Sequence, residues 1–372
     1  MRQADGGDWI VRRTYMRVSI ETLVENARVL RSRIPESVRM LCVVKADAYG
    51  HGAAKLAPAL SGVADAFAVA IVEEARELRE AGIRQMIVIL GGACEESVRE
   101  AVRLGASQAV YEPEMLMELE DEAKKLNVTA KAHLKVDTGM ARIGVRGEDA
   151  LKALLDAWKK CPHVEMEGIF THFCVAENDP EFTEAQNARF ERAIQIVRAA
   201  GYSPIAHAAA SSAMLNPRYQ HDMVRAGIAL YGGGMPEVPE LQYAQTLISM
   251  PIRMETIEPG DTVGYGRTFT AARRTRVMTL PIGYGDGYPR LLGNRAEVLI
   301  RGRRAPVIGN VCMDMLMVDV TDVPDAAVGD TVVLMGAQGD DRITPDELAE
   351  KAETIGYEIM LGFTARVPRV YA

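Results

Sequence analysis

No stretch of about 18 apolar residues, the length that a membrane-spanning helix needs, occurs in the sequence. An excess of positive charge is also missing. Lys and Arg total 43 against 51 Asp and Glu, and the basic residues are scattered rather than grouped. The charged start, residues 1–14, has no apolar stretch behind it that would indicate a signal peptide. We therefore expect a soluble, unexported chain with no membrane or nucleic-acid partner.

Cysteine is scarce, and its spacing excludes two kinds of site. There are five cysteines, an odd number, and no C-x-x-C pair that would indicate a redox or zinc site. They are Cys42, Cys94, Cys161, Cys174 and Cys312. The sequence therefore predicts a reduced, cytoplasmic protein that binds no metal.

Eight short apolar runs alternate with amphipathic stretches between Leu41 and about Gly234. Strands that are buried on both faces read as such continuous runs. The runs are LCVVK, AFAVAI, QMIVIL, SQAVYE, KAHLKV, MEGIFTH, PIAHAAAS and MVRAGIALYG. The stretches between them have apolar residues at helical spacing, and several end in Gly or Asn. Because no G-x-G-x-x-G follows the first run, the alternation predicts an α/β fold with an N-terminal (β/α)8 TIM-like barrel.

Short β runs punctuated by Gly and Pro replace this alternation after about Ile248. They are PIRMETI, TVGYG, RVMTLPIG, EVLI, APVIG, MLMVDV and TVVLMG. One helical segment, TPDELAEKAETIG, interrupts them, with Thr344 as its N-cap and Pro345 in its first turn. We expect residues 1–247 to form the barrel and residues 248–372 to form a C-terminal, mostly-β domain.

Polar residues lie where several predicted barrel strands end. The C-terminal ends of barrel strands meet at one mouth, where functional residues gather. The residues at these ends are Lys45, Lys135, Asp137, His172, Ser211 and Arg225. The sequence therefore predicts a polar site at this mouth.

Lys45 ends the first apolar run, where burial of an amine is costly unless something holds or uses it. The side chain could simply extend to solvent. Alternatively, a partly dehydrated mouth would lower its pKa from about 10.4, so that the amine could form an imine. Pyridoxal phosphate is the cofactor that needs such a lysine.

The other strand ends have two interpretations each. Arg225, if buried, needs a hydrogen-bond partner, because it cannot lose its charge. If that partner is the pyridine nitrogen of the cofactor, the site would favour removal and return of one α-proton. His172 is either a core histidine or a ring stacked on the pyridine face. Ser211 is either a plain N-cap or part of a phosphate site. The Gly227-Ile228 step is either a tight strand end or a source of further N–H donors.

Four residues outside these strand ends, together with Lys135, also have more than one interpretation. Arg142, in DTGMARIG, is either a surface arginine or a bidentate partner for a substrate carboxylate. Lys135 could be barrel packing or an ion-pair partner. In the β domain, Tyr265, Tyr284 and Met313 lie in Gly-rich or turn-like motifs, and they become chemical candidates only if this domain reaches a barrel mouth.

These motifs resemble a known family, the pyridoxal-phosphate-dependent amino-acid racemases of the alanine racemase type (fold type III). The resemblance covers nearly the whole chain, in the order VVKADAYGHG, LKVDTGMARIG, FTHF, HAAASSA, MVRAGIALYG, TVGYGRTFT, PIGYGDGY, GNVCMDM and RVPR. It implies a homodimer that binds pyridoxal 5'-phosphate and interconverts L- and D-alanine, supplying D-alanine for cell-wall peptidoglycan.

The resemblance also implies a role for each site residue. Lys45 would be the Schiff-base lysine and one base, and Tyr265 from the other subunit would be the opposite base, assisted by His172 and Arg142. The residues that hold the cofactor would be Lys45, Tyr49, His172, Ser211, Arg225, Gly227 and Ile228. Those near the substrate would be Arg142 and Met313 at its carboxylate, Tyr284 and Asp314 at the entrance, and Lys135 as a possible carbamylated lysine.

Two positions depart from the family pattern. Ala365, in FTARVPR, replaces the usual tyrosine, and Ala210 replaces the usual asparagine before the cofactor serine. Loss of the tyrosine would widen the substrate side and remove a phosphate hydrogen bond worth about 0.5–1.5 kcal/mol. This leaves open a broad-specificity or serine-preferring racemase.

Two rival functions remain. A decarboxylase on the same architecture would keep the lysine and the phosphate site, but Arg225 opposite the ring nitrogen and the setting of Tyr265 argue against it. A non-catalytic cofactor carrier would need the barrel alone, and the β-rich residues that follow argue against that.

Overall fold

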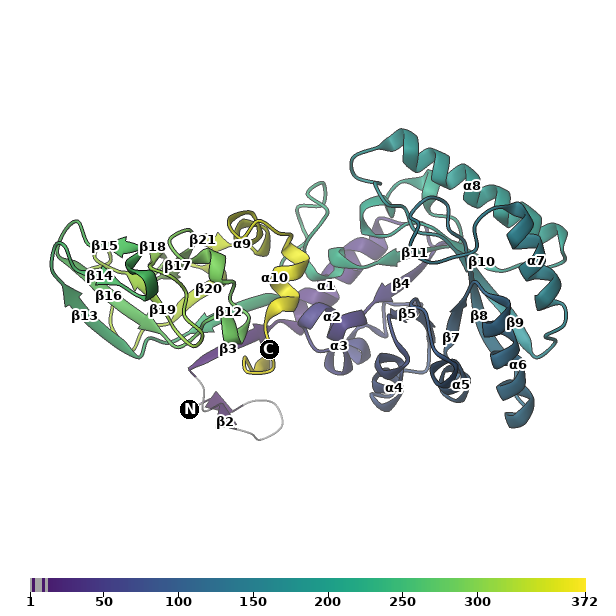
Figure 1. Cartoon of the computed structure of the whole chain (residues 1–372), viewed down its shortest axis with the longest axis horizontal. Coiled ribbons are helices and arrows are strands. Elements are labelled where there is room, and N and C mark those ends of the chain that lie inside the picture. Colours follow the sequence, from purple (N-terminus) through teal and green to yellow (C-terminus); the bar gives the residue numbers. More distant parts are fainter. Residues whose placement is uncertain (1, 4–8, 11–12) are drawn as a thin grey trace. The chain divides into compact units, whose positions relative to one another are not determined.

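The computed structural model describes residues 2–3, 9–10 and 13–372, which form two compact units (Figure 1). One unit comprises Val24–Ala48 and Gly52–Leu241 and is called the barrel unit here. The other, called the β unit, comprises Gln242–Ala372, Tyr49–His51 and the described residues up to Leu23. The expectation about the charged start of the chain falls largely outside the described residues.

Eight parallel strands form the sheet of the barrel unit. They are β4 (Arg39–Val43), β5 (Ala66–Val69), β6 (Met86–Ile89), β7 (Ser107–Val110), β8 (Ala130–Lys135), β9 (Val164–Phe170), β10 (Ile205–His207) and β11 (Met223–Ala226). Their order is β10-β9-β8-β7-β6-β5-β4-β11. The two end strands meet through backbone hydrogen bonds from Asp222 N to Ala206 O and from Arg225 N to Ala209 O, each 3.0 Å. The predicted TIM-like barrel is confirmed.

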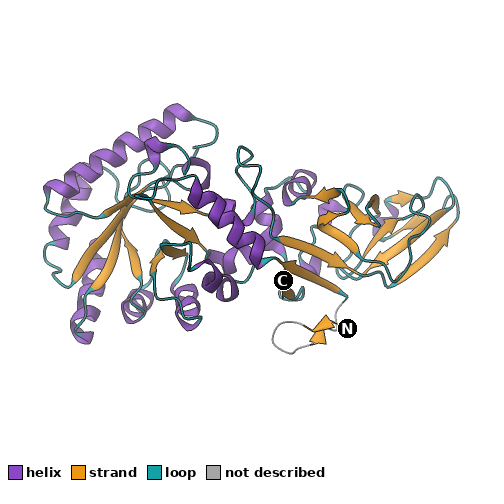
Figure 2. Ribbon diagram, turned by 180° about the vertical axis from the view of Figure 1, so that it is seen from behind, coloured by secondary structure: helices purple, strands orange, loops and turns teal. Residues whose placement is uncertain are grey.

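Helices surround these strands, as Figure 2 shows for the barrel unit. They are α1 (Ile20–Ser32), α2 (Lys45–Gly50), α3 (Ala53–Leu60), α4 (Val72–Glu80), α5 (Glu95–Arg103), α6 (Pro113–Leu126), α7 (Glu148–Trp158) and α8 (Pro180–Ala199). Their ends follow from the sequence. The Asp179 side chain caps α8 by accepting a hydrogen bond from Phe182 N, and α6 ends at Asn127 in the left-handed conformation.

The barrel strands are buried on both faces, which explains their continuous apolar runs. The interior is nevertheless polar along several strands. Buried polar side chains there are Ser107, His133, Glu167, His207 and Arg225. Hydropathy alone does not reveal these residues, because each lies within a predominantly apolar run.

The β unit is built on a mostly antiparallel sheet with the order β13-β16-β19-β18-β17-β20-β12-β3-β22. These strands are β3 (Thr14–Val18), β12 (Gln245–Ser249), β13 (Arg253–Ile257), β16 (Thr275–Leu280), β17 (Glu297–Ile300), β18 (Arg303–Ile308), β19 (Leu316–Asp319), β20 (Val332–Gln338) and β22 (Arg369–Tyr371). Three pairs complete the unit: β21 (Asp341–Ile343) with β20, β14 (Thr262–Val263) with β15 (Phe269–Thr270), and β1 (Arg2–Gln3) with β2 (Trp9–Ile10). The predicted mostly-β domain is confirmed.

Among the described residues after Gln242, two short α-helices lie in the β unit, where the sequence predicts one helical segment. Thr344 is the N-cap of α9 (Pro345–Lys351), since its Oγ1 accepts a hydrogen bond from Glu347 N at 3.0 Å. The chain then turns at Glu353, whose φ is 56°, before α10 (Gly356–Gly362) begins. This left-handed residue ends the first helix and separates the two.

No helix in the described part of the chain is both long and apolar enough to cross a membrane.

Candidate active site

The predicted strand-end residues of the barrel unit lie together at one mouth. Lys45 follows β4, Lys135 ends β8, His172 follows β9, Ser211 follows β10 and Arg225 lies in β11. Because all eight strands are parallel, these ends meet at one edge of the barrel. Burial lowers the pKa of His172, and the charges of Arg225, Arg142, Lys135 and Lys45 lower it further.

Lys45 presents a half-buried amine to this mouth. Burial and then the charge of Arg142 lower its pKa, with a smaller contribution from Arg225, whereas Glu74 opposes the shift. Among the described residues, none accepts a hydrogen bond from this amine. Both effects favour the neutral, nucleophilic form of this amine.

The backbone after Lys45 is left-handed over four successive residues that are not glycine. Ala46, Asp47, Ala48 and Tyr49 have φ values of 52°, 53°, 52° and 54°. Each such residue costs about 1–2 kcal/mol, so surrounding contacts must hold the turn. Ala46 N donates to Glu74 Oε1 at 2.5 Å, and Asp47 Oδ1 accepts from Ala53 N at 2.7 Å. Strain of this kind is concentrated at functional sites.

Tyr49 ends this turn and groups with the β unit. Its ring lies 6.1 Å from the ring of Tyr357, and burial raises the pKa of its hydroxyl.

Arg225 is buried, and among the described residues no carboxylate pairs with it. Its Nη1 donates to His207 Nδ1 at 3.0 Å, and its Nη2 donates to His172 Nδ1 at 3.1 Å and to Ala208 O at 2.7 Å. Burial, and secondarily Arg142, lower its pKa to about 9, so Arg225 still carries its charge at neutral pH. The described residues leave its Nε without a hydrogen-bond acceptor.

Burial lowers the pKa of His172 well below its usual value, and Arg225 lowers it further. The neutral ring accepts at Nδ1 from Arg225, so its proton lies on Nε2.

Lys135 is more deeply buried than Lys45. Its Nζ donates to Val136 O at 2.9 Å and lies 5.2 Å from the centre of the Phe170 ring. Burial, followed by the charge of Arg225, lowers its pKa to about 7. This amine is therefore substantially neutral near physiological pH.

Arg142 lies exposed on the loop that follows β8. Asp137 shapes this loop, because its Oδ1 accepts hydrogen bonds from Gly139 N, Met140 N and Ala141 N at 2.9–3.1 Å. These bonds outweigh the effect of burial and lower the pKa of the Asp137 carboxyl. The loop is thus braced at the residues immediately before Arg142.

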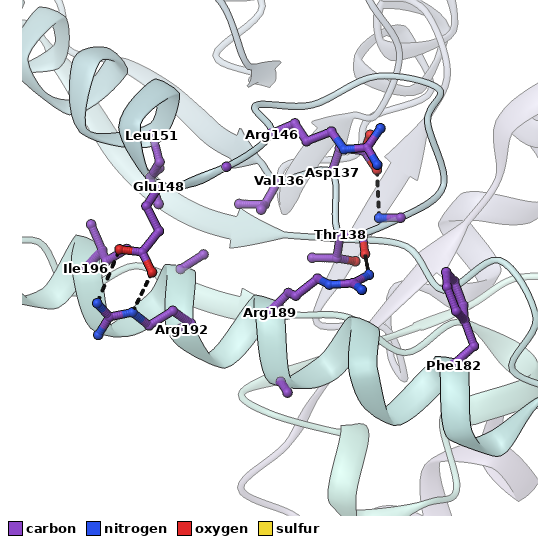
Figure 3. Close-up of a pocket in the computed structure, with 14 residues that line it drawn as sticks. Val136, Asp137, Thr138, Arg146, Glu148, Leu151, Phe182, Arg189, Arg192 and Ile196 are labelled. Carbon is purple, nitrogen blue, oxygen red and sulfur yellow. Dashed lines mark hydrogen bonds and ion pairs between the residues drawn. The ribbon is translucent and has the colours of Figure 1, made fainter.

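A cavity of about 640 Å³ lies behind this loop, against α7 and α8 (Figure 3). Its polar groups are paired with one another. Arg192 forms an ion pair with Glu148 at 2.9 Å, and Arg189 Nη1 donates to Thr138 O at 2.7 Å. The Arg189 contact ties α8 to the loop that carries Arg142.

Ser211 and the Gly227-Ile228 step are brought together at the mouth. Ser211 Oγ accepts from Gly227 N at 3.0 Å and from Ala229 N at 3.2 Å. A hydroxyl therefore lies beside two backbone N–H groups, an arrangement that suits an anion. Ala210, which precedes this serine, is half-buried.

The remaining candidates lie on loops of the β unit. Tyr265 is 74% exposed in a turn between Gly264 and Gly266, and its carbonyl accepts from Asn310 Nδ2 at 2.7 Å. Tyr284 N donates to Cys312 O at 3.0 Å, which places the Tyr284 turn beside the Met313 segment.

Met313 and Tyr284 are 53% and 43% exposed. Asp314 forms an ion pair with Arg366 at 2.6 Å, and the adjacent Ala365 is exposed.

Sequence reasoning does not identify Glu74, which holds the strained turn, or the interior residues His133, Glu167 and His207. One signal was available for His133, because it lies two residues before Lys135 and so on the same face of β8. In the described part of the chain, no cluster of three or more His, Cys, Asp or Glu side chains could hold a metal ion.

The fold and this mouth define a class of two-domain enzymes in which a parallel barrel is followed by a β domain. Family comparison then identifies the particular family. The description "Alanine racemase, N-terminal domain" matches residues 18–235, and "Alanine racemase, C-terminal domain" matches residues 244–371. The chain belongs to the alanine racemase family and is an isomerase of that type.

Individual relatives agree with this assignment. The chain is 42% identical over 371 residues to the alanine racemase of Symbiobacterium thermophilum, with 97% of each chain covered. Among solved structures, it is similar to the alanine racemase of Clostridium difficile 630, with a TM-score of 0.91, 33% identity, and 98% and 97% of the two chains covered. The Bacillus anthracis alanine racemase with bound L-Ala-P gives a TM-score of 0.91 at 32% identity, covering 98% and 96%.

Proposed function

We propose that this protein racemises alanine with pyridoxal 5'-phosphate, using Lys45 and the Tyr265 of a second subunit as two bases. The observation that carries the proposal is the half-buried amine of Lys45, with its lowered pKa, in the same mouth as a buried arginine with no carboxylate partner among the described residues. The similarity to alanine racemases over 97% of the chain supports the same activity.

The residues present fit this cofactor. No described residue accepts a hydrogen bond from the amine of Lys45. The same holds for Nε of Arg225, which can therefore donate to a ring nitrogen. Ser211, Gly227 and Ile228 would hold the phosphate together with the hydroxyl of Tyr49, and His172 would contact the ring. When bound, pyridoxal phosphate withdraws electrons from the substrate and so acidifies its α-proton.

Arg225 would keep its proton while donating to the ring nitrogen, since a guanidinium is a very weak acid. The nitrogen then stays largely unprotonated and withdraws fewer electrons than it would opposite a carboxylic acid. This arrangement favours removal and return of one proton over decarboxylation.

Lys45 would remove or deliver the α-proton on one face of the substrate, and the lowering of its pKa by burial favours the neutral amine that this role needs. Tyr265 would do the same on the opposite face, assisted by Arg142 and His172. The exposure of Tyr265 suits a residue that completes the site of another subunit, so we propose a homodimer in which residues 248–372 complete the partner's site. Each enantiomer then presents its proton to one of the two bases.

Arg142 and Met313 would hold the substrate carboxylate, and Tyr284 and Asp314 would line the entrance. We also propose that Lys135 is carbamylated. Its pKa of about 7 leaves an amine able to attack the carbon of carbon dioxide, releasing one proton to water. The carbamate anion would then face Arg142.

Alanine is the favoured substrate, and serine or longer amino acids form the second candidate because Ala365 is exposed where the family usually has a tyrosine. All five cysteines, which lie in the described residues, are free thiols. This supports a reducing, cytoplasmic location. On the proposed activity alone, we also propose a role in supplying D-alanine for peptidoglycan.

The proposal is tested by assaying purified, cofactor-loaded protein with L-alanine and D-alanine while recording the cofactor absorbance. We expect racemisation in both directions and no release of carbon dioxide. Lys45→Ala should lose both the covalently held cofactor and the activity, whereas Lys55→Ala, a change at an exposed lysine, should retain both. Carbon dioxide release at the rate of turnover would show a decarboxylase instead.

A further inference from the structure

A continuous row of hydrogen-bonded side chains crosses the barrel interior from Arg225 to Glu167. Arg225 Nη1 contacts His207 Nδ1 at 3.0 Å, and His207 Nε2 contacts His133 Nδ1 at 2.9 Å. His133 Nε2 then contacts Glu167 Oε2 at 3.3 Å. All four side chains are buried and come from four different strands, β11, β10, β8 and β9.

The proton positions in this row follow from the chemistry of its ends. Arg225 can only donate, so His207 Nδ1 must accept and the proton of His207 lies on Nε2. His207 therefore donates to His133 Nδ1, which places the proton of His133 on Nε2, facing the Glu167 carboxylate. Burial, and then the charge of Arg225, lower the pKa of His207 well below its usual value, in agreement with a neutral ring.

Glu167 is an ionised carboxylate that accepts hydrogen bonds at the far end of the row. Burial alone would raise its pKa, but hydrogen bonds from His133, Lys131 and Ser107 lower it to about 2. Lys131 Nζ lies 2.6 Å from Oε1 and remains half-exposed, so it links this end of the row to solvent.

The local backbone is shaped to admit this row. The pairing of β8 with β9 shifts at this point: Ala132 lies opposite Met166 and His133 lies opposite Gly168, which leaves Glu167 as the additional residue of a β-bulge. Bulges of this kind redirect a side chain. A Cβ on Gly168 would lie 2.3 Å from His133 Nδ1, so only glycine leaves room for the ring.

Aromatic packing fixes the orientation of the rings. Phe170 stacks on His207 at 4.9 Å with an interplanar angle of 5°, and it meets His133 edge-on at 6.4 Å. This packing fixes the planes of the two rings, and the hydrogen bonds of the row fix which nitrogen faces which partner.

We propose that Glu167 and His133 are positioning residues: they fix the tautomer of His207, and His207 holds the Arg225 guanidinium in place for the cofactor ring. The role toward the cofactor ring rests on the proposed function. The positions of the protons on His207 and His133 do not depend on it. Glu167 also supplies the negative charge that Arg225 lacks among its direct partners, through a chain of aligned dipoles in a water-poor interior.

The most informative variant is Glu167→Gln, which keeps the shape of the side chain. The carboxylate accepts from Lys131 on one oxygen and from His133 on the other. An amide has only one oxygen, so its NH2 group must face one of these donors. The control is Glu165→Gln, on the same strand but exposed.

Nitrogen-15 NMR of histidine-labelled protein, without and with pyridoxal phosphate, reads the tautomers directly. We expect Nε2–H at both His133 and His207 in the unaltered protein and in Glu165→Gln. Glu167→Gln should show a mixture, and adding Lys131→Ala should restore the original pattern, because the amide oxygen is then free to face His133.

Steady-state kinetics test the consequence for Arg225. With alanine, Glu167→Gln should lower kcat about tenfold, the rate equivalent of about 1.4 kcal/mol, because the Arg225 guanidinium is then less well held for the cofactor ring. KM should stay roughly unchanged, since Arg142 and Met313 are untouched.

Several results would overturn the proposal. One is an Nδ1–H tautomer at His207 or His133 in the unaltered protein. Another is a change in tautomer without a change in kcat, or a fall in kcat without a change in tautomer. If the predicted tautomers are found in a protein that does not racemise alanine, the proposed function fails while the proton pattern stands.

Discussion

Replacing Ala46 with glycine should stabilise the protein, because Ala46 lies in the left-handed turn after Lys45. Ala46 is exposed and has φ of 52°, so replacing it with glycine removes no buried contact. Relief of the left-handed strain is worth about 1–2 kcal/mol, and the additional freedom of glycine in the unfolded chain costs about 0.5–1 kcal/mol. Ala46→Gly should therefore raise the free energy of unfolding by about 0.5–1 kcal/mol.

The matched control is Ala188→Gly, at an exposed position inside α8, where glycine should lower the free energy of unfolding by about 0.5–1 kcal/mol. Urea unfolding followed by circular dichroism, compared between the variants, measures both differences. If Ala46→Gly destabilises the protein as much as Ala188→Gly, the turn is not strained and the reasoning is wrong.

Two further predictions concern Lys135 and Ala365. The folded-state pKa of Lys135, about 7, lies below its ordinary value of 10.5, so the unfolded chain binds more protons between these values and stability should rise with pH across this window. In buffer free of carbon dioxide, Lys135→Met should weaken this rise between pH 7 and pH 9, and an identical slope in both proteins would contradict the shift. Ala365→Tyr should increase the preference for alanine over serine, lysine and arginine in kcat/KM, and an unchanged preference would exclude Ala365 as a determinant of substrate range.

The sequence predicts the barrel well because its strands are buried on both faces, so hydrophobicity marks each strand directly. Lys45, His172, Ser211 and Arg225 could be proposed for the same reason, since each is a polar residue at or near the end of an apolar run. Their convergence follows from the parallel order of the strands and requires no knowledge of loop structure.

Other features depend on contacts that local sequence does not encode. The residues Ala46–Tyr49 include no glycine, and the left-handed turn exists because Glu74, nearly thirty residues away, accepts a hydrogen bond from Ala46 N. The row from Arg225 to Glu167 likewise requires four strands to be placed in one ring, and a bulge to turn Glu167 inward.

The N-terminal strand β3 is a third case. It pairs with β12 and β22, which lie more than two hundred residues further along the chain, so its partners cannot be read from its own apolar pattern.

The central claim, that Lys45 and Tyr265 of two different subunits form one site, can be tested by mixing two inactive variants. Lys45→Ala and Tyr265→Phe should each fail to racemise alanine, with Tyr265→Phe still holding its cofactor. After equal mixing and subunit exchange, half of the dimers are mixed and each has one intact site, so activity should return to about a quarter of the original. No recovery, despite verified exchange, would contradict a site shared between subunits.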